Sequence, residues 1–240
     1  MKKIIILIAI ILIPIITKAE EIEAIEEKYY KTVEVTPIIT SSNSSNLKIT
    51  NTYEISEEEY NLGEEEQSRS NIIVETTYKK MTVTIVKSQS VYKYTIKLHW
   101  KNMPSTRSFD IIGLAYYGSV EPYLSPIFEQ EYCLSNGNCY TSSTHYPRQE
   151  NNTVSALFEL PTGSLTSLDQ TLFVVVGKKN PNSTIISQKA VGDYAHATSN
   201  VTLGATWGYT MSMGGISLAA SVITSYDEIS TAQATWSGTW

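Results

Sequence analysis

Apolar and polar positions alternate with a period of two over much of the chain. In residues 81–85 the odd positions are apolar and the even positions are threonine. In residues 92–100 the even positions are Tyr, Tyr, Ile, Leu and Trp, and the odd positions are Lys, Thr, Lys and His. Such a period gives a half-buried β-strand with one apolar and one polar face. The short gap at residues 87–90 predicts that these two strands form a hairpin.

The alternation continues through the C-terminal part of the chain. Residues 199–213, 216–226 and 232–236 each carry apolar side chains at every second position, opposite small, hydroxyl or amide side chains. Residues 214–215 (Gly-Gly) and 227–228 (Asp-Glu) separate these stretches and are typical of turns. Three strands joined by short turns predict a three-stranded antiparallel meander.

The remaining strands are shorter, and none of the chain after the first nineteen residues has a helical period. Residues 172–176 (Leu-Phe-Val-Val-Val) are continuously apolar, which predicts a central strand covered on both faces. About nine strands with loop-rich connections predict an all-β fold, an antiparallel β-sandwich of the Greek-key or jelly-roll kind. The other candidate strands lie at residues 47–55, 110–116, 154–160 and 184–190.

The first nineteen residues have the layout of a secretory signal peptide. Residues 1–3 are a short basic start, residues 4–16 are almost wholly apolar, and Ala19 offers a small residue for cleavage. The apolar run is too short to cross a bilayer, which needs about 20 residues. The sequence therefore predicts a secreted, extracellular protein that is cleaved near Ala19.

Charge divides the remaining chain into two parts. Without the three lysines of the signal segment, 15 basic and 24 acidic residues remain, a net charge of −9. Residues 20–75 hold 14 acids and 4 bases, whereas the later part is nearly neutral. We predict an acidic, partly disordered leader over residues 20–70 and a single β-sandwich domain over residues 71–240. The acidic balance excludes a nucleic-acid partner, which would need a basic patch.

Two cysteines, Cys133 and Cys139, are the only ones in the chain. Asn136 and Gly137 between them favour a turn that brings the two Cα atoms within disulfide range. In an oxidising compartment this spacing predicts a disulfide that stiffens a short loop.

A search for catalytic chemistry gives little. The motifs of serine hydrolases, zinc proteases and nucleotide-binding proteins are absent, so we predict no catalytic site, no metal and no cofactor. His99 falls on the polar face of its strand, and His196 has Asp193 near it in sequence. A glycosidase-like pair of carboxylates could come from distant strands, with Glu129, Glu131 and Glu159 as candidates.

Residues 100–113 are dense in unusual side chains and predict a tight connection between two strands. Trp100 ends one strand, Pro104 enforces a turn, and the next strand begins near residue 109. Arg107 and Asp110 lie three residues apart across this turn, where a charge-assisted pair would pin it. We interpret Trp100, Pro104, Arg107 and Asp110 as a structural turn rather than a ligand site.

Two segments carry a resemblance to a group of secreted proteins of Gram-positive bacteria. Residues 100–113 read W-K-x-M-P-S-x-R-S-x-D-I-I-G, and residues 194–198 read Y-x-H-A-T ahead of an alternating tail. Proteins of that group are similar in both segments. The resemblance implies export and a β fold, and it does not point to any particular activity. Tyr194 and His196 are the candidates for a binding surface in this part of the chain.

These observations favour a secreted, non-enzymatic bacterial protein, a binding or cell-surface-associated module whose partner is an extracellular ligand or a cell-wall component. The chain holds 16 tyrosines against 4 phenylalanines, and tyrosine suits half-wet sheets and binding surfaces. A membrane-inserting or pore-forming β protein is the alternative, because lipid-facing hairpins alternate in the same way as residues 199–226. An ordinary sheet with one solvated face fits that pattern as well. A secreted hydrolase is the third reading.

Overall fold

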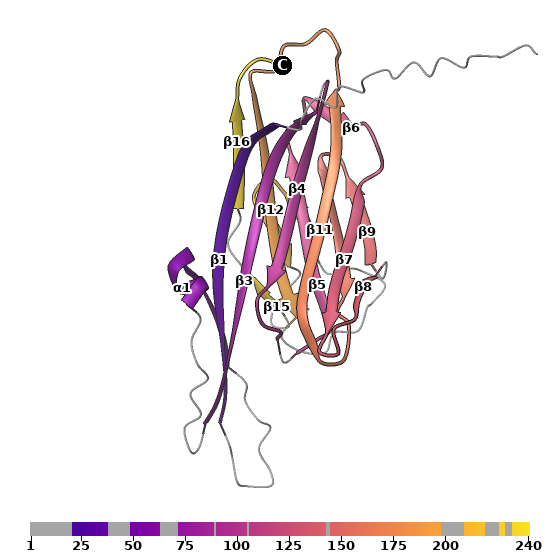
Figure 1. The fold of residues 1–240 in the computed structure, drawn as a ribbon. Coiled ribbons are helices and arrows are strands. Elements are labelled where there is room, and N and C mark those ends of the chain that lie inside the picture. The colour runs from indigo at the N-terminus through magenta and orange to yellow at the C-terminus, as the bar shows by residue number, and fades with distance from the viewer. Residues whose placement is uncertain are drawn as a thin grey trace, which may run out of the picture.

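Antiparallel strands form nearly all the regular structure in a computed structural model of the chain. They build two sheets, A and B, that pack face to face as a sandwich (Figure 1). The predicted all-β sandwich is therefore confirmed. The structure describes residues 21–37, 49–62, 72–88, 90–104, 106–142, 145–197, 209–218, 226–228 and 232–240.

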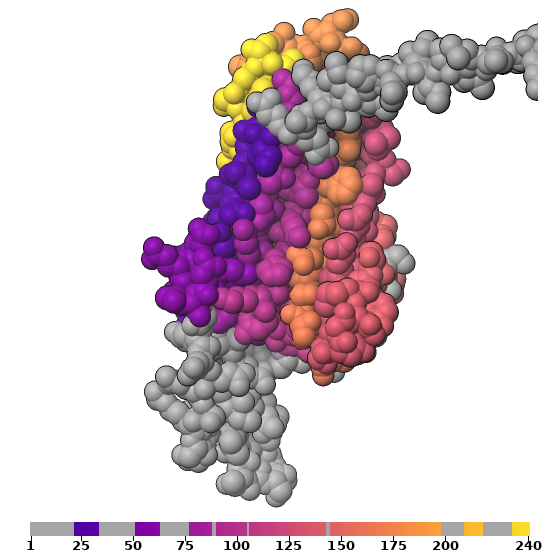
Figure 2. All heavy atoms as spheres, viewed as in Figure 1, coloured from indigo at the N-terminus to yellow at the C-terminus, as the bar shows by residue number. Residues whose placement is uncertain are grey.

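Sheet A contains the predicted hairpin, which is confirmed by the facing pair Ser88 and Val91. The outer face of this sheet is turned toward the viewer in Figure 2, where the bands of β1, β3, β4, β11 and β7 run side by side. Its strands, in spatial order, are β2 (Ile49–Ile55), β1 (Glu21–Pro37), β3 (Ile72–Ser88), β4 (Val91–Trp100), β11 (Leu165–Lys178), β7 (Ile127–Leu134) and β8 (Cys139–Ser142), and β6 (Val120–Pro122) pairs with the end of β11.

Sheet B is built around β12 and β5. Its strands, in spatial order, are β15 (Tyr226–Glu228), β12 (Ser187–Ala197), β5 (Phe109–Tyr116), β10 (Thr153–Glu159) and β9 (His145–Glu150), and β16 (Ala232–Ser237) also pairs with β12. A separate hairpin is formed by β13 (Tyr209–Ser212) and β14 (Gly215–Leu218).

The main core lies between the inner faces of the two sheets. Alternate residues of β4, such as Ile96 and Leu98, are fully buried against residues of β5 such as Ile112 and Leu114. Gly192 of β12 allows a close approach, because a Cβ atom there would lie 2.5 Å from Cγ2 of Val83. The predicted alternation of residues 92–100 is thus the signature of this interface.

The prediction of a partly disordered leader over residues 20–70 does not fit the described part of that segment. β1 pairs with β3 along its whole length, and Tyr30 is buried in the core. The glutamates are compatible with strands because each faces a lysine on the neighbouring strand: Glu27 of β1 lies 2.7 Å from Lys80 of β3, and Glu54 of β2 lies 3.0 Å from Lys28 of β1. These cross-strand pairs place acidic residues on the solvated face of sheet A.

A short helix, α1 (Glu57–Leu62), lies within the segment that was predicted as an acidic, partly disordered leader. The backbone N–H of Glu59 donates to the hydroxyl of Ser56 at 3.1 Å, which caps the helix, and three glutamates fill its first turn. Tyr60 anchors the helix against Tyr29 at 5.0 Å between ring centroids. A serine followed by three glutamates was the local signal for this helix.

The predicted three-stranded meander is wrong in its pairing. The hairpin with its turn before Gly215 forms, but β15 and β16 pair with β12 and not with β14. The β13–β14 hairpin instead packs on the outer face of sheet B, where Tyr209 and Ile216 contact a cluster around Ile111 and Leu157. Short local turns favoured sequential pairing, but burial of this outer apolar face decided the arrangement.

The burial of β11 differs from the prediction that both of its faces are covered. β11 is central, as predicted for residues 172–176, but only one of its faces is fully buried. Phe173 lies on the outer face, where Nζ of Lys93 is 5.7 Å from its ring centroid. β5 is covered on both faces, because the β13–β14 hairpin overlies it: Sδ of Met211 lies 2.6 Å from where a Cβ of Gly113 would be.

Candidate functional site

The two sequence segments that carry the resemblance meet inside the sandwich. Asp110 of β5 and His196 of β12 are paired in register, and Oδ1 of Asp110 lies 2.7 Å from Nδ1 of His196. The indole of Trp100 packs at 5.1 Å from the His196 ring and at 6.2 Å from the Tyr194 ring, measured between centroids. Nζ of Lys79 lies over both rings, 4.8 Å from Trp100 and 5.3 Å from Tyr194.

This cluster is interior. Tyr194 is 0% and His196 is 1% exposed, so the candidate binding surface at these two residues is not a surface of the folded chain. Within the described residues, Oδ2 of Asp110 and Nε2 of His196 have no hydrogen-bond partner. The cluster therefore joins β3, β4, β5 and β12 at one end of the core, through a buried hydrogen bond and cation–π contacts.

The turn between β4 and β5 is held differently from the expected charge pair. Arg107 donates from Nε to the carbonyl oxygen of Pro104 at 3.3 Å, and from a terminal guanidinium nitrogen to the carbonyl oxygen of Gly163. The predicted Arg107–Asp110 pair is wrong, because Asp110 already belongs to β5 and the alternation of that strand directs it inward to His196.

The disulfide between Cys133 and Cys139 is confirmed, with the two residues facing each other across β7 and β8. Gly137 adopts a positive φ of 85° in the connecting turn, which a glycine tolerates without strain. The bridge stiffens the hairpin at the edge of sheet A.

The three glutamates of the hydrolase reading are not brought together. Glu129 and Glu131 lie on β7 of sheet A, and Glu159 ends β10 of sheet B. Glu131 faces Asp169 across β7 and β11, and both line a hollow of about 320 Å³ beside the disulfide. A general acid needs a raised pKa, and that of Asp169 is shifted the other way.

Asp169 is held by Lys97 and His99 on the outer face of sheet A. Its Oδ1 lies 3.0 Å from Nζ of Lys97 and 3.1 Å from Nδ1 of His99. Burial by itself raises the pKa of Asp169, but the hydrogen bonds from His99 and Lys97 outweigh it and hold that pKa below its usual range. His99 lies on the polar face of its strand as expected. We interpret Asp169, Lys97 and His99 as a structural polar cluster.

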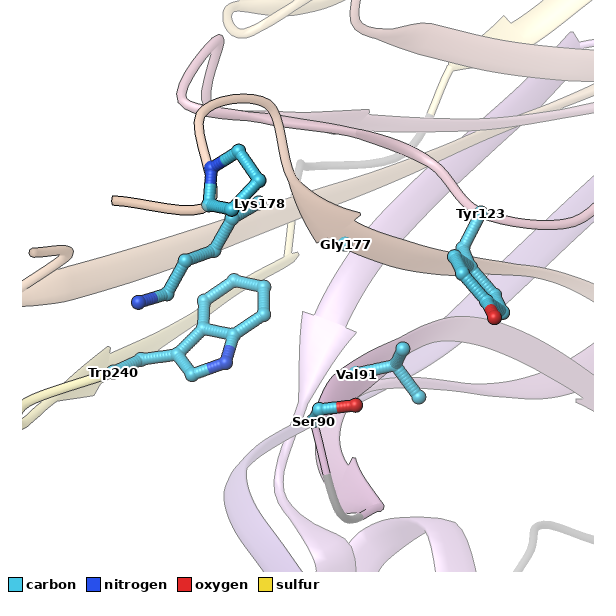
Figure 3. Close-up of a pocket in the computed structure, with 7 residues that line it drawn as sticks. Ser90, Val91, Tyr123, Gly177, Lys178 and Trp240 are labelled. Atoms are coloured by element: carbon cyan, nitrogen blue, oxygen red, sulfur yellow. The ribbon is translucent and has the colours of Figure 1, made fainter. Parts of the chain in front are cut away.

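The opposite end of the sandwich carries an aromatic pocket of about 380 Å³. Figure 3 shows Trp240 and Lys178 on one side, Tyr123 on the other, and Val91 and Ser90 between them. The residues that line it are Ser90, Val91, Tyr123, Gly177, Lys178, Pro181 and Trp240.

Rigid neighbours position the two aromatic rings. The backbone of Trp240 exchanges hydrogen bonds of 3.0 and 2.9 Å with Ile185, and its indole packs edge-on against the buried Tyr92 at 4.5 Å. The N–H of Tyr123 donates to the carbonyl oxygen of Val175 at 2.7 Å, which ties the segment after β6 to β11. Because Tyr123 is 68% exposed, its ring is presented to solvent.

Lys178 gives the pocket its charge. Nζ donates to the carbonyl oxygen of Ser183 at 2.9 Å and lies 5.7 Å from the centroid of the Trp240 indole. Gly177 leaves the wall open beside Tyr123. The arrangement can hold a ring between aromatic surfaces while a cationic donor reaches its edge.

The loops around this pocket expose further apolar side chains. Tyr117 and Leu124 are exposed on either side of β6. Ile186 is also exposed, and its carbonyl oxygen accepts a hydrogen bond from the N–H of Gly238, two residues before Trp240. Exposed aromatic and aliphatic groups on loops at one end of a sandwich are typical of a binding surface. Sequence reasoning missed this site, since its residues come from four separate segments without a motif.

The alternating pattern of residues 199–226 suggested membrane insertion. In the described residues 209–218, this pattern is explained by packing on sheet B. Tyr209 is buried, and its hydroxyl donates to Oγ of Ser155 at 3.1 Å. Ile216 packs beside it, and its N–H donates to Oδ2 of Asp193 at 2.7 Å. Among the described residues, no helix is long and apolar enough to cross a membrane.

Comparisons with known proteins give only distant likenesses. No family model matches the chain. No curated protein matches it either. The collagen-binding domain from a Staphylococcus aureus adhesin is 11% identical, with a TM-score of 0.26, over 45% of this chain and 85% of that one. A structure from a study of pH-induced modulation of Streptococcus parasanguinis adhesion by Fap1 fimbriae is 9% identical, with a TM-score of 0.30, over 65% and 80% of the two chains. At these TM-scores the likeness carries no information about function.

Proposed function

We propose that the chain is a secreted, non-enzymatic bacterial binding module that holds an extracellular ligand or a cell-wall component in the aromatic pocket. The observation that carries the proposal is the placement of Trp240, Tyr123 and Lys178 around one open pocket, at the end where Tyr117 and Leu124 are also exposed. Large aromatic side chains on rigid supports supply contact area at little entropic cost.

Binding to purified Gram-positive cell-wall sacculi and to an array of immobilised glycans tests this function. We expect retention of the native chain and at least about tenfold weaker retention of Tyr123→Ala, since a hot-spot aromatic contributes at least this much. Tyr53→Ala is the matched control, because Tyr53 is a similarly exposed tyrosine on the distant edge strand β2. Retention that is equal for all three proteins would place the binding surface elsewhere, and no retention on either support would contradict the proposal.

Secretion is part of the same proposal. Its support is the layout of residues 1–19 together with a formed disulfide, which suits an oxidising compartment. Expression of the full sequence in a Gram-positive host, followed by N-terminal sequencing of the protein from the medium, should give a chain that begins near Glu20. A protein that stays in the cells with Met1 intact would contradict secretion.

A further inference from the structure

We infer that the aromatic pocket takes a carbohydrate ring that carries a carboxylate, as in a uronic acid. This inference rests on the proposed binding function and names the chemical class of its ligand. It follows from the two aromatic surfaces, from the one charged side chain among the residues that line the pocket, and from the openness of the pocket to water.

The aromatic surfaces fit a saturated ring. Trp240 is fixed by two backbone hydrogen bonds and by its edge-on contact with Tyr92, so its indole is a preorganised platform. Tyr123 faces the pocket from the opposite side (Figure 3). The C–H faces of a sugar ring are apolar and pack on aromatic faces, while its hydroxyl groups project outward from the ring edge.

The charge of the pocket favours an anion. Lys178 is the one charged side chain among the described residues that line it, and no Asp or Glu is among them, although the whole chain has a net charge of −6. An ammonium has three N–H donors, and the hydrogen bond to the Ser183 carbonyl oxygen uses one of them. The remaining donors can reach a carboxylate on a ring that stacks against Trp240, whose indole is 5.7 Å from Nζ.

The openness of the pocket favours a sugar over a purely apolar acid. Ser90 and Pro181 are exposed at its rim, and Tyr123 is largely in water. A ligand held here keeps one edge in water. Hydroxyl groups on that edge stay hydrated, so they pay no desolvation cost on binding. The hydroxyl of Ser90 adds a neutral donor and acceptor at the same rim.

The test compares two probes that differ only at C6 of each sugar, where one carries a carboxylate and the other a neutral hydroxymethyl group. A β-1,4-linked glucuronate oligomer and the glucose oligomer of the same length are titrated into the full chain by calorimetry at low salt. We expect the glucuronate oligomer to bind about tenfold or more tightly, a preference typical of one charge-assisted contact. Lys178→Met should abolish this preference. Lys179→Met, which removes the same charge from the exposed neighbouring residue, should keep it.

The outcomes separate this inference from the proposed function. Tyr123→Ala should weaken both oligomers, and Tyr53→Ala should weaken neither. Equal affinity for the two oligomers, or a preference that survives Lys178→Met, would overturn the acidic-sugar inference while Tyr123-dependent binding to sacculi keeps the binding function. Failure of both oligomers to bind would likewise overturn the inference, and the sacculus experiment would then decide the function alone. Thermal unfolding of each variant checks that its fold is intact.

Discussion

Asp110 and His196 form a buried hydrogen bond between adjacent strands of sheet B. Replacing Asp110 by Ala leaves Nδ1 of His196 buried without this partner, so we expect the free energy of unfolding to fall by about 1–3 kcal/mol. In a double-mutant cycle with His196→Ala, the coupling energy should be about 1 kcal/mol or more. Urea denaturation followed by fluorescence measures each corner of the cycle.

The exposed variant Lys179→Ala should change stability by less than about 0.5 kcal/mol and serves as the control. Additive effects of the Asp110 and His196 substitutions would show that the two side chains do not interact.

Asp169 gives a prediction about pH. Its pKa is lower in the folded chain than its ordinary value of 3.8, so its contacts with Lys97 and His99 stabilise the fold above that pH and lose this effect as the pH falls below it. We expect Asp169→Asn to lower the free energy of unfolding by about 1 kcal/mol at neutral pH, as a partly exposed cluster allows. The difference from the native chain should vanish near pH 2.

Denaturation curves at several pH values test this prediction. The corresponding substitution at an exposed carboxylate, Glu121→Gln, is the control, and it should change the free energy of unfolding little at neutral pH. If Asp169→Asn remained less stable than the native chain by the same free energy of unfolding at low pH, the charge of the carboxylate would not be the cause of the difference.

At the residue scale, sequence reasoning found contacts within short segments and missed those between distant ones. Cys133 and Cys139 are six residues apart, and their pairing was predictable. Asp110 and His196 are 86 residues apart, so the sequence offered Arg107 and Asp193 as nearer and wrong partners. Charge complementarity alone cannot rank such partners, because strand order decides which side chains meet.

Two glycines report on how closely the elements pack. A Cβ at Gly192 would lie 2.5 Å from Cγ2 of Val83 and 2.9 Å from Cδ1 of Ile96, both in the opposite sheet. We expect Gly192→Ala to destabilise the fold by about 1–3 kcal/mol through overpacking. Gly113→Ala should cost less, because its neighbour is the flexible side chain of Met211.

Thermal unfolding of the two variants ranks these costs. Gly177→Ala is the control, since its Cβ would make an ordinary contact of 3.7 Å with Tyr123. If Gly192→Ala were as stable as Gly177→Ala, the sheets would not approach each other at β12 as described.

At the element scale, periodicity predicted strands well where one face meets the core and poorly elsewhere. β4 alternates because only its inner face is covered, and its hairpin with β3 was predictable from the short gap between them. β5 does not alternate, because a hairpin from almost a hundred residues later covers its outer face. β1 was missed because its glutamates signal solvation locally, while Lys80 and Lys87, which face Glu27 and Glu23, lie on β3.

At the scale of the whole molecule, the acidic N-terminal segment is part of the sandwich. Deleting residues 20–62 removes β1, β2 and α1 together with the core residue Tyr30. We expect the remaining chain to lose its cooperative thermal transition, because β3 and the inner face beneath β1 become uncovered. In the full chain, Tyr30→Ala should lower the free energy of unfolding by about 3 kcal/mol.

Circular dichroism during heating distinguishes the alternatives. A sharp transition in the shortened chain, at a temperature close to that of the full chain, would restore the view of residues 20–70 as a dispensable leader.

The two ends of the described chain meet where β16 packs against β1, and there Nε1 of Trp236 donates to Oε2 of Glu23 at 2.7 Å across 213 residues. A nascent chain of only the first two hundred residues cannot form this hydrogen bond, because Trp236 has not yet been added. Such a chain also lacks β16, which packs against β1. Vectorial synthesis thus leaves the nascent polypeptide incomplete as a tertiary structure until its last segment emerges. In the secreted protein that we propose, this late completion of the fold would favour passage through a translocation channel during synthesis.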